Sequence, residues 1–225
     1  MEIINGIYLI DGIRGANSYL CTVGANVLVI DTGMPGNEER ILQQVKTLDK
    51  SPKDVRVIIL THADIDHSGS AAALKKITGA MIAIHEGDAP GLAGKKELKR
   101  VKGLIGVIFR LMARFMKFQT VKADIILKDG DEITPLKVIH TPGHTEGSIC
   151  LYIAGNTLFA GDALRTNNKS HLRLPRNLWT LNMQEAIKSV KKIADLDYDI
   201  LLPGHGKPVV GKASAKVKKL LANDK

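Results

Sequence analysis

The stretch Thr61-His62-Ala63-Asp64-Ile65-Asp66-His67-Ser68-Gly69 places four side chains that can bind a metal ion within six residues. It follows an apolar run at 55–60, which predicts a buried strand. A helix is expected from about Ser68 to Ile77, so the cluster lies on a loop at the carboxyl end of that strand. Parallel α/β folds place their sites at such ends, because the loops there project into a common crevice.

The residue types in this loop indicate a metal centre. Imidazole and carboxylate groups suit zinc, iron or manganese, and a catalytic centre must keep one position for water. An exposed acidic loop with two incidental histidines is the alternative. Three further stretches argue against it: Thr141-Pro142-Gly143-His144-Thr145-Glu146-Gly147-Ser148, Ala160-Gly161-Asp162 and Pro203-Gly204-His205-Gly206. Each follows a β-like run and so presents one histidine or aspartate at the end of a strand.

In this order the motifs resemble the metallo-β-lactamase superfamily, and the resemblance spans nearly the whole chain. Val29-Ile30-Asp31-Thr32-Gly33 is similar to the first motif of that family, whose aspartate ties loops together beneath the site. The resemblance implies an α/β fold, a four-layer αββα sandwich with the metals at one edge. It also implies one domain over residues 1–225, with a helical insert at about 87–122.

The resemblance further implies two divalent metal ions, most simply zinc, with iron or manganese as alternatives. The first metal would be held by His62, position 64 and His144. The second would be held by Asp66, His67 and His205, and Asp162 would bridge the two ions. Position 64 departs from the family pattern His-x-His-x-Asp-His, because Asp64 stands where the second histidine is usual. A carboxylate there could ligate the first metal, support it indirectly or leave it more open, and it favours harder ions such as iron or manganese.

This site predicts a metal-dependent hydrolase in which a metal-bound hydroxide attacks a small ester, thioester or lactone that can be anionic. Asp66 or Asp162 would carry the proton towards the leaving group, as the two catalytic carboxylates. Branches similar to glyoxalase II and the lactonases are the expected relatives. The true β-lactamases often place a cysteine in the second metal site, and no cysteine stands at the matching place here. The alternatives are a mononuclear iron dioxygenase acting on a persulfide-like thiol, which would need His62, His144 and Asp162, and a phosphoesterase or nuclease.

The length, amino-terminal sequence, cysteines and charge of the chain further restrict the class of protein. A length of 225 residues fits one substantial domain. The amino terminus lacks the basic start and apolar core of a signal peptide, and no apolar run approaches a membrane span, so a cytoplasmic protein is expected. Cys21 and Cys150 lie in strand-like stretches and are expected to be buried thiols. The net charge of +9 is concentrated at 95–122 and 207–225, and basic patches of this kind attract phosphates or acidic substrates.

The helical insert at about 87–122 is a segment that the family fold does not require. Val101–Phe118 is expected to form a helix with a wide apolar face and a narrow basic stripe. Phe109 and Phe115 on it are candidate substrate contacts, and so are Arg165 and His171 in the loop at 164–180 that follows the bridging aspartate. The helix could instead pack on the core, form a homodimer contact or lie on a membrane surface. A small molecule is the expected partner, and nucleic acid is not, because the insert lacks the interleaved aromatic and basic residues of a strand-binding groove.

Local patterns predict the remaining elements. Strands are expected at Ile3–Ile10, Ser18–Val23, Asn26–Ile30, Met81–His85, Ile149–Ile153, Thr157–Ala160 and Tyr198–Leu202. A hairpin around Asp129-Gly130 is expected to join Asp124–Leu127 to Glu132–Thr141. Helices are expected at Asn37–Lys50, capped by Asn37, and at Met183–Leu196 and Gly211–Leu221. His85 and His140 are expected to be structural.

Overall fold

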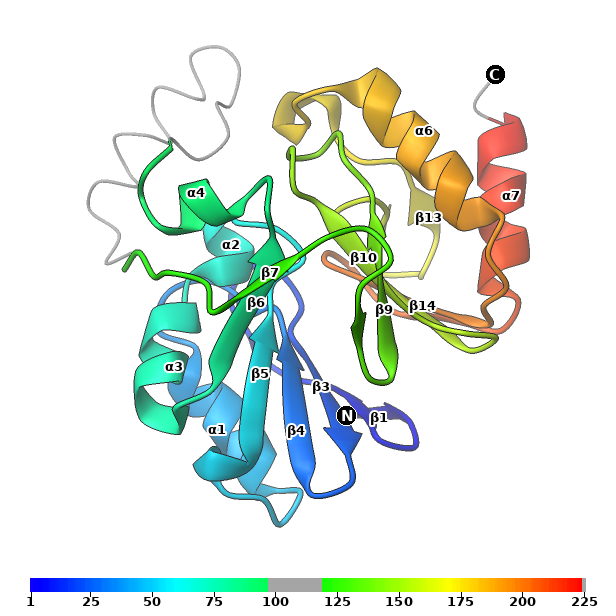
Figure 1. Cartoon of the computed structure of the whole chain (residues 1–225). Coiled ribbons are helices and arrows are strands. Elements are labelled where there is room, and N and C mark those ends of the chain that lie inside the picture. Colours follow the sequence, from blue (N-terminus) through cyan, green and yellow to red (C-terminus); the bar gives the residue numbers. More distant parts are fainter. Residues whose placement is uncertain (97–118, 224–225) are drawn as a thin grey trace. The chain divides into compact units, whose positions relative to one another are not determined.

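The computed structural model describes residues 1–96 and 119–223 (Figure 1). The predicted helix Val101–Phe118, with Phe109 and Phe115, lies outside the described residues. The chain forms two compact units, Met1–Ile126 and Leu127–Lys225. Each unit contains one large β-sheet with its own helices, and each is described separately.

The first unit is built on a seven-stranded sheet in sequence order, β1 to β7. Its strands are β1 (Glu2–Ile4), β2 (Ile7–Leu9), β3 (Tyr19–Val23), β4 (Asn26–Ile30), β5 (Val55–Ile59), β6 (Met81–His85) and β7 (Ile125–Leu127). Strands β1 to β4 are antiparallel, whereas β4, β5 and β6 run parallel. Parallel strands need crossover connections. The connections here carry the 3-10 helix η1 (Pro52–Asp54) and the helices α1 (Glu38–Lys46), α2 (Ile65–Ser68) and α3 (Ala71–Thr78), and α4 (Ala89–Leu92) follows β6.

Helices α1 and α3 cover one face of this sheet with apolar side chains. Ile41 and Val45 of α1 and Leu74 of α3 lie in one core cluster with Val29 and Ile58 of the sheet. Helix α3 ends at Gly79, whose positive φ of 74° gives the left-handed cap that glycine adopts without strain. This glycine ends the helix two residues before β6 begins.

Three local predictions in this unit were wrong. The run Ile3–Ile10 is two strands, because Gly6 turns the chain at φ 80° and lets β1 pair back on β2. The helix predicted from about Ser68 to Ile77 is present as α3 but begins at Ala71, and residues Ile65–Ser68, all but the last of which were predicted to lie in the loop, form the short helix α2. The helix predicted at 37–50 ends at Lys46, and the side chain of Asn37 does not cap it. That amide instead bonds the backbone of Arg14, accepting from its nitrogen at 3.1 Å and donating to its oxygen at 2.9 Å.

The second unit is built on a six-stranded sheet in the order β15-β14-β11-β10-β9-β8. Its strands are β8 (Glu132–Ile133), β9 (Leu136–His140), β10 (Ile149–Ile153), β11 (Thr157–Gly161), β14 (Ile200–Pro203) and β15 (Val209–Val210). A small two-stranded sheet joins β12 (Arg165–Thr166) to β13 (Leu172–Arg173), and the 3-10 helix η2 (Asn177–Trp179) follows. Helices α6 (Met183–Ala194) and α7 (Ala213–Asn223) supply Val190, Ile193 and Val217 to a core cluster with Leu158 and Leu201.

The hairpin predicted around Asp129-Gly130 is also wrong. Strand β7 belongs to the first sheet, and the partner of β9 is the short strand β8. The predicted strand at 132–141 reverses direction at Thr134-Pro135, so its two parts, β8 and β9, pair antiparallel with each other. The strands predicted at 149–153 and 157–160 are confirmed as β10 and β11, and the helix predicted at 183–196 is confirmed as α6, which ends at Ala194.

Both cysteines are free and buried, as the sequence predicts. Burial raises the pKa of the Cys21 thiol to about 11 and that of Cys150 to about 12. Both thiols are therefore protonated at neutral pH and act as small apolar groups of the core. Among the described residues, the helices are all too short or too polar to cross a lipid bilayer.

Candidate metal centre

Four of the predicted metal ligands lie in the loop after β5 and in helix α2 of the first unit: His62, Asp64, Asp66 and His67. This loop is fixed by Asp31, which is buried and directly follows β4. The Asp31 carboxylate accepts hydrogen bonds from the backbone nitrogen of Thr61 at 2.8 Å and from its hydroxyl at 2.7 Å. It also accepts from Nδ1 of His67 at 2.8 Å. One buried carboxylate thus ties the strand end to the helix that carries two of the ligands.

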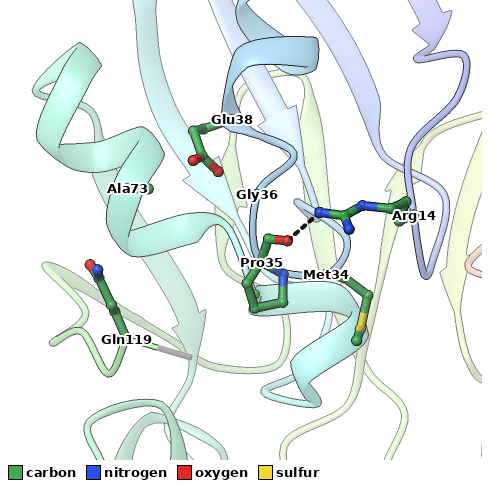
Figure 2. Close-up of a pocket in the computed structure, with 8 residues that line it drawn as sticks. Arg14, Met34, Pro35, Gly36, Glu38, Ala73 and Gln119 are labelled. Carbon is green, nitrogen blue, oxygen red and sulfur yellow. Dashed lines mark hydrogen bonds between the residues drawn. The ribbon is translucent and has the colours of Figure 1, made fainter. Parts of the chain in front are cut away.

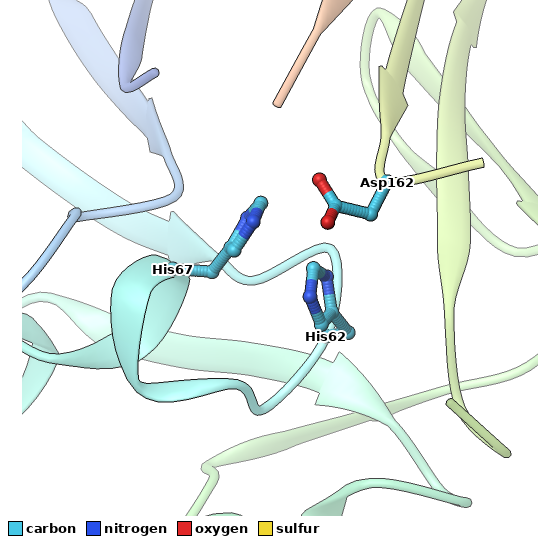
Figure 3. Close-up of side chains that lie close together, drawn as sticks. All are labelled: His62, His67 and Asp162. Carbon is cyan, nitrogen blue, oxygen red and sulfur yellow. The ribbon is translucent and has the colours of Figure 1, made fainter. Parts of the chain in front are cut away.

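This network sets the tautomers of two histidines. Nδ1 of His67 must carry a proton, because its partner Asp31 can only accept. The Thr61 hydroxyl gives its proton to Asp31 and so accepts from Nδ1 of His62, 3.0 Å away. In both rings the lone pair therefore lies on Nε2, which is the arrangement a metal-binding histidine needs. Figure 3 shows the two rings side by side, with centroids 4.0 Å apart.

Asp64 begins helix α2 with its backbone rather than its side chain. Its carbonyl oxygen accepts from the nitrogens of His67 and Ser68, both at 2.9 Å, and its carboxylate makes no capping bond. The side chain is 18% exposed, and its Oδ2 lies 3.6 Å from Nε2 of His62. That separation is too long for a hydrogen bond. The carboxylate therefore faces the lone pair of a candidate ligand.

We expect Asp64→Ala to weaken binding of the first metal by roughly tenfold to a hundredfold, because a metal-facing oxygen is removed. Asp64→His should retain that metal and shift the preference from iron towards zinc, since imidazole is the softer ligand. Metal competition followed by elemental analysis measures both effects. Glu39→Ala, which removes an exposed carboxylate from α1, is the matched control. Unchanged affinity and preference in both Asp64 variants would exclude a role in binding.

The second unit supplies three ligand-type side chains from three strand ends: His144 after β9, Asp162 after β11 and His205 after β14. Strands β11 and β14 are parallel neighbours, so their carboxyl ends lie at the same edge of the sheet. The His144 loop is held against α6, because the carbonyl oxygens of Gly143 and His144 accept from residues 182 and 181. Gly143 has φ 127°, and a side chain there would meet the backbone of Ala186, so the loop requires glycine.

The imidazoles of His144 and His205 both face the carboxylate of Asp162. Nε2 of His144 lies 3.4 Å from Oδ2 of Asp162, and Nε2 of His205 lies 3.5 Å from Oδ1. Two ligands bonded to one tetrahedral zinc ion at 2.0–2.1 Å are about 3.3–3.4 Å apart, so these separations fit a shared ion. Asp162 turns one oxygen to each histidine, which is what a bridging carboxylate does. The donor set of both units, imidazole and carboxylate, therefore fits zinc, iron or manganese.

The other predicted site residues have separate places. Arg165 is half-buried in β12, where its Nε donates to the carbonyl oxygen of Leu174 at 3.1 Å. His171 is exposed and directly precedes β13. His85 is buried and its Nδ1 accepts from the nitrogen of Gly87, and Nε2 of His140 lies 2.9 Å from the carbonyl oxygen of Glu146. Those contacts agree with structural roles for His85 and His140.

Two supporting residues were missed from the sequence. Thr61 relays the hydrogen bond from His62 to Asp31, and buried Asp88 accepts from the backbone nitrogen of Ala63 at 2.9 Å. Thr61 could have been recognised, because a hydroxyl directly before a ligand histidine can fix its tautomer. Asp88 gives no such signal, since it lies 25 residues away in the chain.

A hollow of about 540 Å³ lies elsewhere in the first unit (Figure 2). Its described lining is Arg14, Met34, Pro35, Gly36, Glu38, Gly69, Ala73 and Gln119. The guanidinium of Arg14 donates to the carbonyl oxygen of Pro35 at 2.8 Å and so holds the loop before α1. None of the predicted metal ligands is among the described residues of this lining.

Comparison with known proteins establishes the family. The sequence profile that describes the metallo-β-lactamase superfamily matches residues 11–205, and this range includes all seven predicted ligands. The chain belongs to this superfamily and is a metal-dependent hydrolase, and the resemblance drawn from its motifs is confirmed.

Three relatives illustrate the range of the superfamily around this chain. YflN of Bacillus subtilis, a probable metallo-hydrolase, is 29% identical over 82% of this chain and 77% of its own length. The hydroxyacylglutathione hydrolase GloC of Haemophilus influenzae is 29% identical over 80% of each chain. The human acyl-coenzyme A thioesterase MBLAC2 is 29% identical over 66% of this chain and 58% of its own length.

Solved structures share the fold. The metallo-β-lactamase family protein TTHA1429 of Thermus thermophilus matches with a TM-score of 0.74 and 21% identity, over 99% of this chain and 80% of that one. The class B3 di-zinc metallo-β-lactamase LRA-12 from an Alaskan soil metagenome gives a TM-score of 0.73 and 21% identity, over 99% and 90%. The predicted α/β fold of the metallo-β-lactamase type is thereby confirmed.

Proposed function

We propose that this chain hydrolyses thioesters of small acyl groups with two bound divalent metal ions, zinc in the simplest case. The observation that carries the proposal is the group His144, Asp162 and His205, in which a carboxylate faces two imidazoles at ligand-like separations. The relatives GloC and MBLAC2 support the choice of thioester, because both names describe removal of an acyl group from sulfur.

The proposed ligand assignment follows the family motif. By that motif, His62, Asp64 and His144 would hold one ion, Asp66, His67 and His205 would hold the other, and Asp162 would be shared by the two. A divalent metal, when bound, lowers the pKa of a coordinated water and polarises the carbonyl oxygen of the substrate. In the overall reaction the water oxygen bonds to the acyl carbon, the carbon–sulfur bond breaks, and a carboxylic acid and a thiol are released.

The protein residues orient these groups and move the proton. Asp31 and Thr61 keep the lone pairs of His62 and His67 on Nε2, so both rings are prepared to bind without rearrangement. Asp66 and Asp162 are the carboxylates assigned to take the proton of the water and deliver it to the leaving sulfur. Such a transfer by a positioned side chain contributes typically about 10²–10⁴-fold to rate.

One observation favours a second candidate function. The carboxylate of Asp64 beside His62 is a harder donor than the usual histidine and suits iron. A mononuclear iron enzyme that oxidises a persulfide-like thiol with dioxygen would use His62, His144 and Asp162. It would give no role to His67, although Asp31 holds that ring in the orientation of a ligand.

The test combines metal content with substrate choice. The purified protein is analysed for metal and then assayed with an acyl thioester, the matched oxygen ester, a lactone and a phosphodiester, following release of thiol or acid. We expect about two metal equivalents, fastest hydrolysis of the thioester, and loss of activity on chelation that zinc restores. Faster phosphodiester cleavage would contradict thioester hydrolysis. One iron with consumption of dioxygen on a persulfide would establish the second candidate instead.

A further inference from the structure

A cluster of positive side chains lines a hollow of about 460 Å³ within the second unit. We call it the basic pocket and define it by Arg165, Thr166, Asn167, Asn168, Lys169, Arg173 and Arg176. Four of these seven residues are cations and none is acidic. The volume lies within the range of small-molecule sites, roughly 300–1,000 Å³.

The fold holds these cations together. Strands β12 and β13 pair Arg165 directly with Arg173, so the two side chains share one face of the small sheet. Arg165 is fixed by the bond from its Nε to the carbonyl oxygen of Leu174. Between the strands, the side-chain oxygen of Asn167 accepts from the nitrogens of Lys169 and His171, which closes the connecting loop. These contacts therefore hold the backbone of the pocket and the side chain of Arg165, whereas the side chains of Lys169, Arg173 and Arg176 are exposed to solvent.

The cluster is electrostatically unfavourable by itself. Like charges directly opposite on a strand pair are destabilising. Partial burial and the neighbouring charges of Arg176 and Arg173 lower the pKa of Arg165, while Asp162 acts in the opposite direction. No ion pair joins the pocket arginines to a carboxylate in residues 1–96 and 119–223. A bound anion would supply the missing countercharge.

The pocket adjoins the ligand residues of its own unit. The backbone nitrogen of Thr166 donates to the carbonyl oxygen of His205 at 2.9 Å, and its hydroxyl donates to the carbonyl oxygen of Lys207 at 2.6 Å. A side chain at position 206 would collide with Thr166, so Gly206 is needed for this close approach. Asp162 precedes Arg165 by three residues and contributes to its electrostatic environment.

We propose that the basic pocket binds the phosphate groups of a phosphorylated thiol carrier of the coenzyme A type. The inference rests on the proposed thioester hydrolysis and names its substrate class. Three guanidinium forks and one ammonium suit tetrahedral, multiply charged phosphates, which accept bidentate bonds from arginine. A carrier anchored here would leave its acyl thioester to reach the neighbouring His205 and Asp162.

Calorimetric titration of the metal-loaded protein with free coenzyme A tests the proposal directly. We expect Arg173→Gln and Arg176→Gln each to weaken binding about tenfold, because each removes charge-assisted hydrogen bonds. The control Lys188→Gln, which removes an exposed cation of α6 outside the pocket, should leave the affinity unchanged. Thermal unfolding without ligand should show Arg173→Gln at least as stable as the wild type, since a like-charge contact is relieved.

Two further probes identify the source of the phosphate. Pyrophosphate should compete with coenzyme A but bind more weakly, and glutathione, which has carboxylates and no phosphate, should not compete. Equal coenzyme A affinity in all variants, or pyrophosphate binding as tight as that of coenzyme A, would overturn the carrier assignment. Hydrolysis of simple thioesters would survive that result, whereas failure of hydrolysis with intact coenzyme A binding would refute the catalytic proposal alone.

Discussion

His67→Ala and His205→Ala are each expected to remove one of two bound metal ions and to retain the other. Both residues are assigned to the same ion, one from α2 and one from the loop after β14. Removing one of its few protein ligands leaves that ion too weakly held to survive purification. The rate of thioester hydrolysis should fall by about a hundredfold to a thousandfold, since a bound metal contributes several kcal/mol to such a transition state.

Elemental analysis and hydrolysis rates on the same preparations measure these effects. His171→Ala is the matched control, because His171 is an exposed histidine of the second unit outside the predicted ligand set. Its metal content should equal that of the wild type. If His67→Ala and His205→Ala both keep the wild-type metal content, these histidines hold no second ion and the two-ion assignment is wrong. A wild-type content of one ion would then favour a single ion held by His62, His144 and Asp162.

The candidate site was predictable because its ligands follow strands. Each apolar run that ends in a histidine or aspartate became a strand in the structure: β5 before His62, β9 before His144, β11 before Asp162 and β14 before His205. Carboxyl ends of parallel strands lie at one edge of a sheet, so the motifs along the chain already implied that the ligand side chains would lie at strand ends. Their order also implied the family that the comparisons confirmed.

The errors came from features that depend on distant partners or on single residues. The Asp124–Leu127 segment has the pattern of a hairpin strand, but it pairs within the first sheet, and local pattern does not specify a partner. Glycine at position 6 splits one predicted strand into two, because a glycine within an alternating run can be a bulge or a turn. The side chain of Asn37 was assigned to a helix cap, yet it bonds a loop 23 residues away.

The basic pocket likewise could not be predicted in full from local sequence patterns. Arg165 was singled out from the sequence as a candidate substrate contact, but its neighbours were not. The pairing of Arg165 with Arg173 depends on the register of β12 and β13, and these two-residue strands are too short for periodicity to reveal. Spatial grouping of charge across a loop of this kind is visible only once the strands are placed.

The orientation of His62 and His67 depends on the single carboxylate of Asp31. This residue is 2% exposed and has a positive φ of 56°, which is unusual for a residue other than glycine. Backbone strain of this kind persists where the surroundings fix it, often at functional sites. Here the surroundings are the hydrogen bonds from Thr61 and His67.

Asp31→Asn is expected to preserve the size of the side chain but to disrupt the hydrogen bonds that it accepts from Thr61 and His67. The amide nitrogen can only donate, so at least one of the donors now facing the carboxylate would meet another donor. The proton on Nδ1 of His67 would no longer be fixed, and we expect metal affinity to fall by roughly tenfold to a hundredfold. Metal competition measures this loss. Asp124→Asn is the control, since Asp124 accepts from Lys75 and from the backbone of Ile82 without contacting a ligand. A loss of metal affinity in both variants, in proportion to their loss of folding stability, would mean that Asp31 only supports the fold.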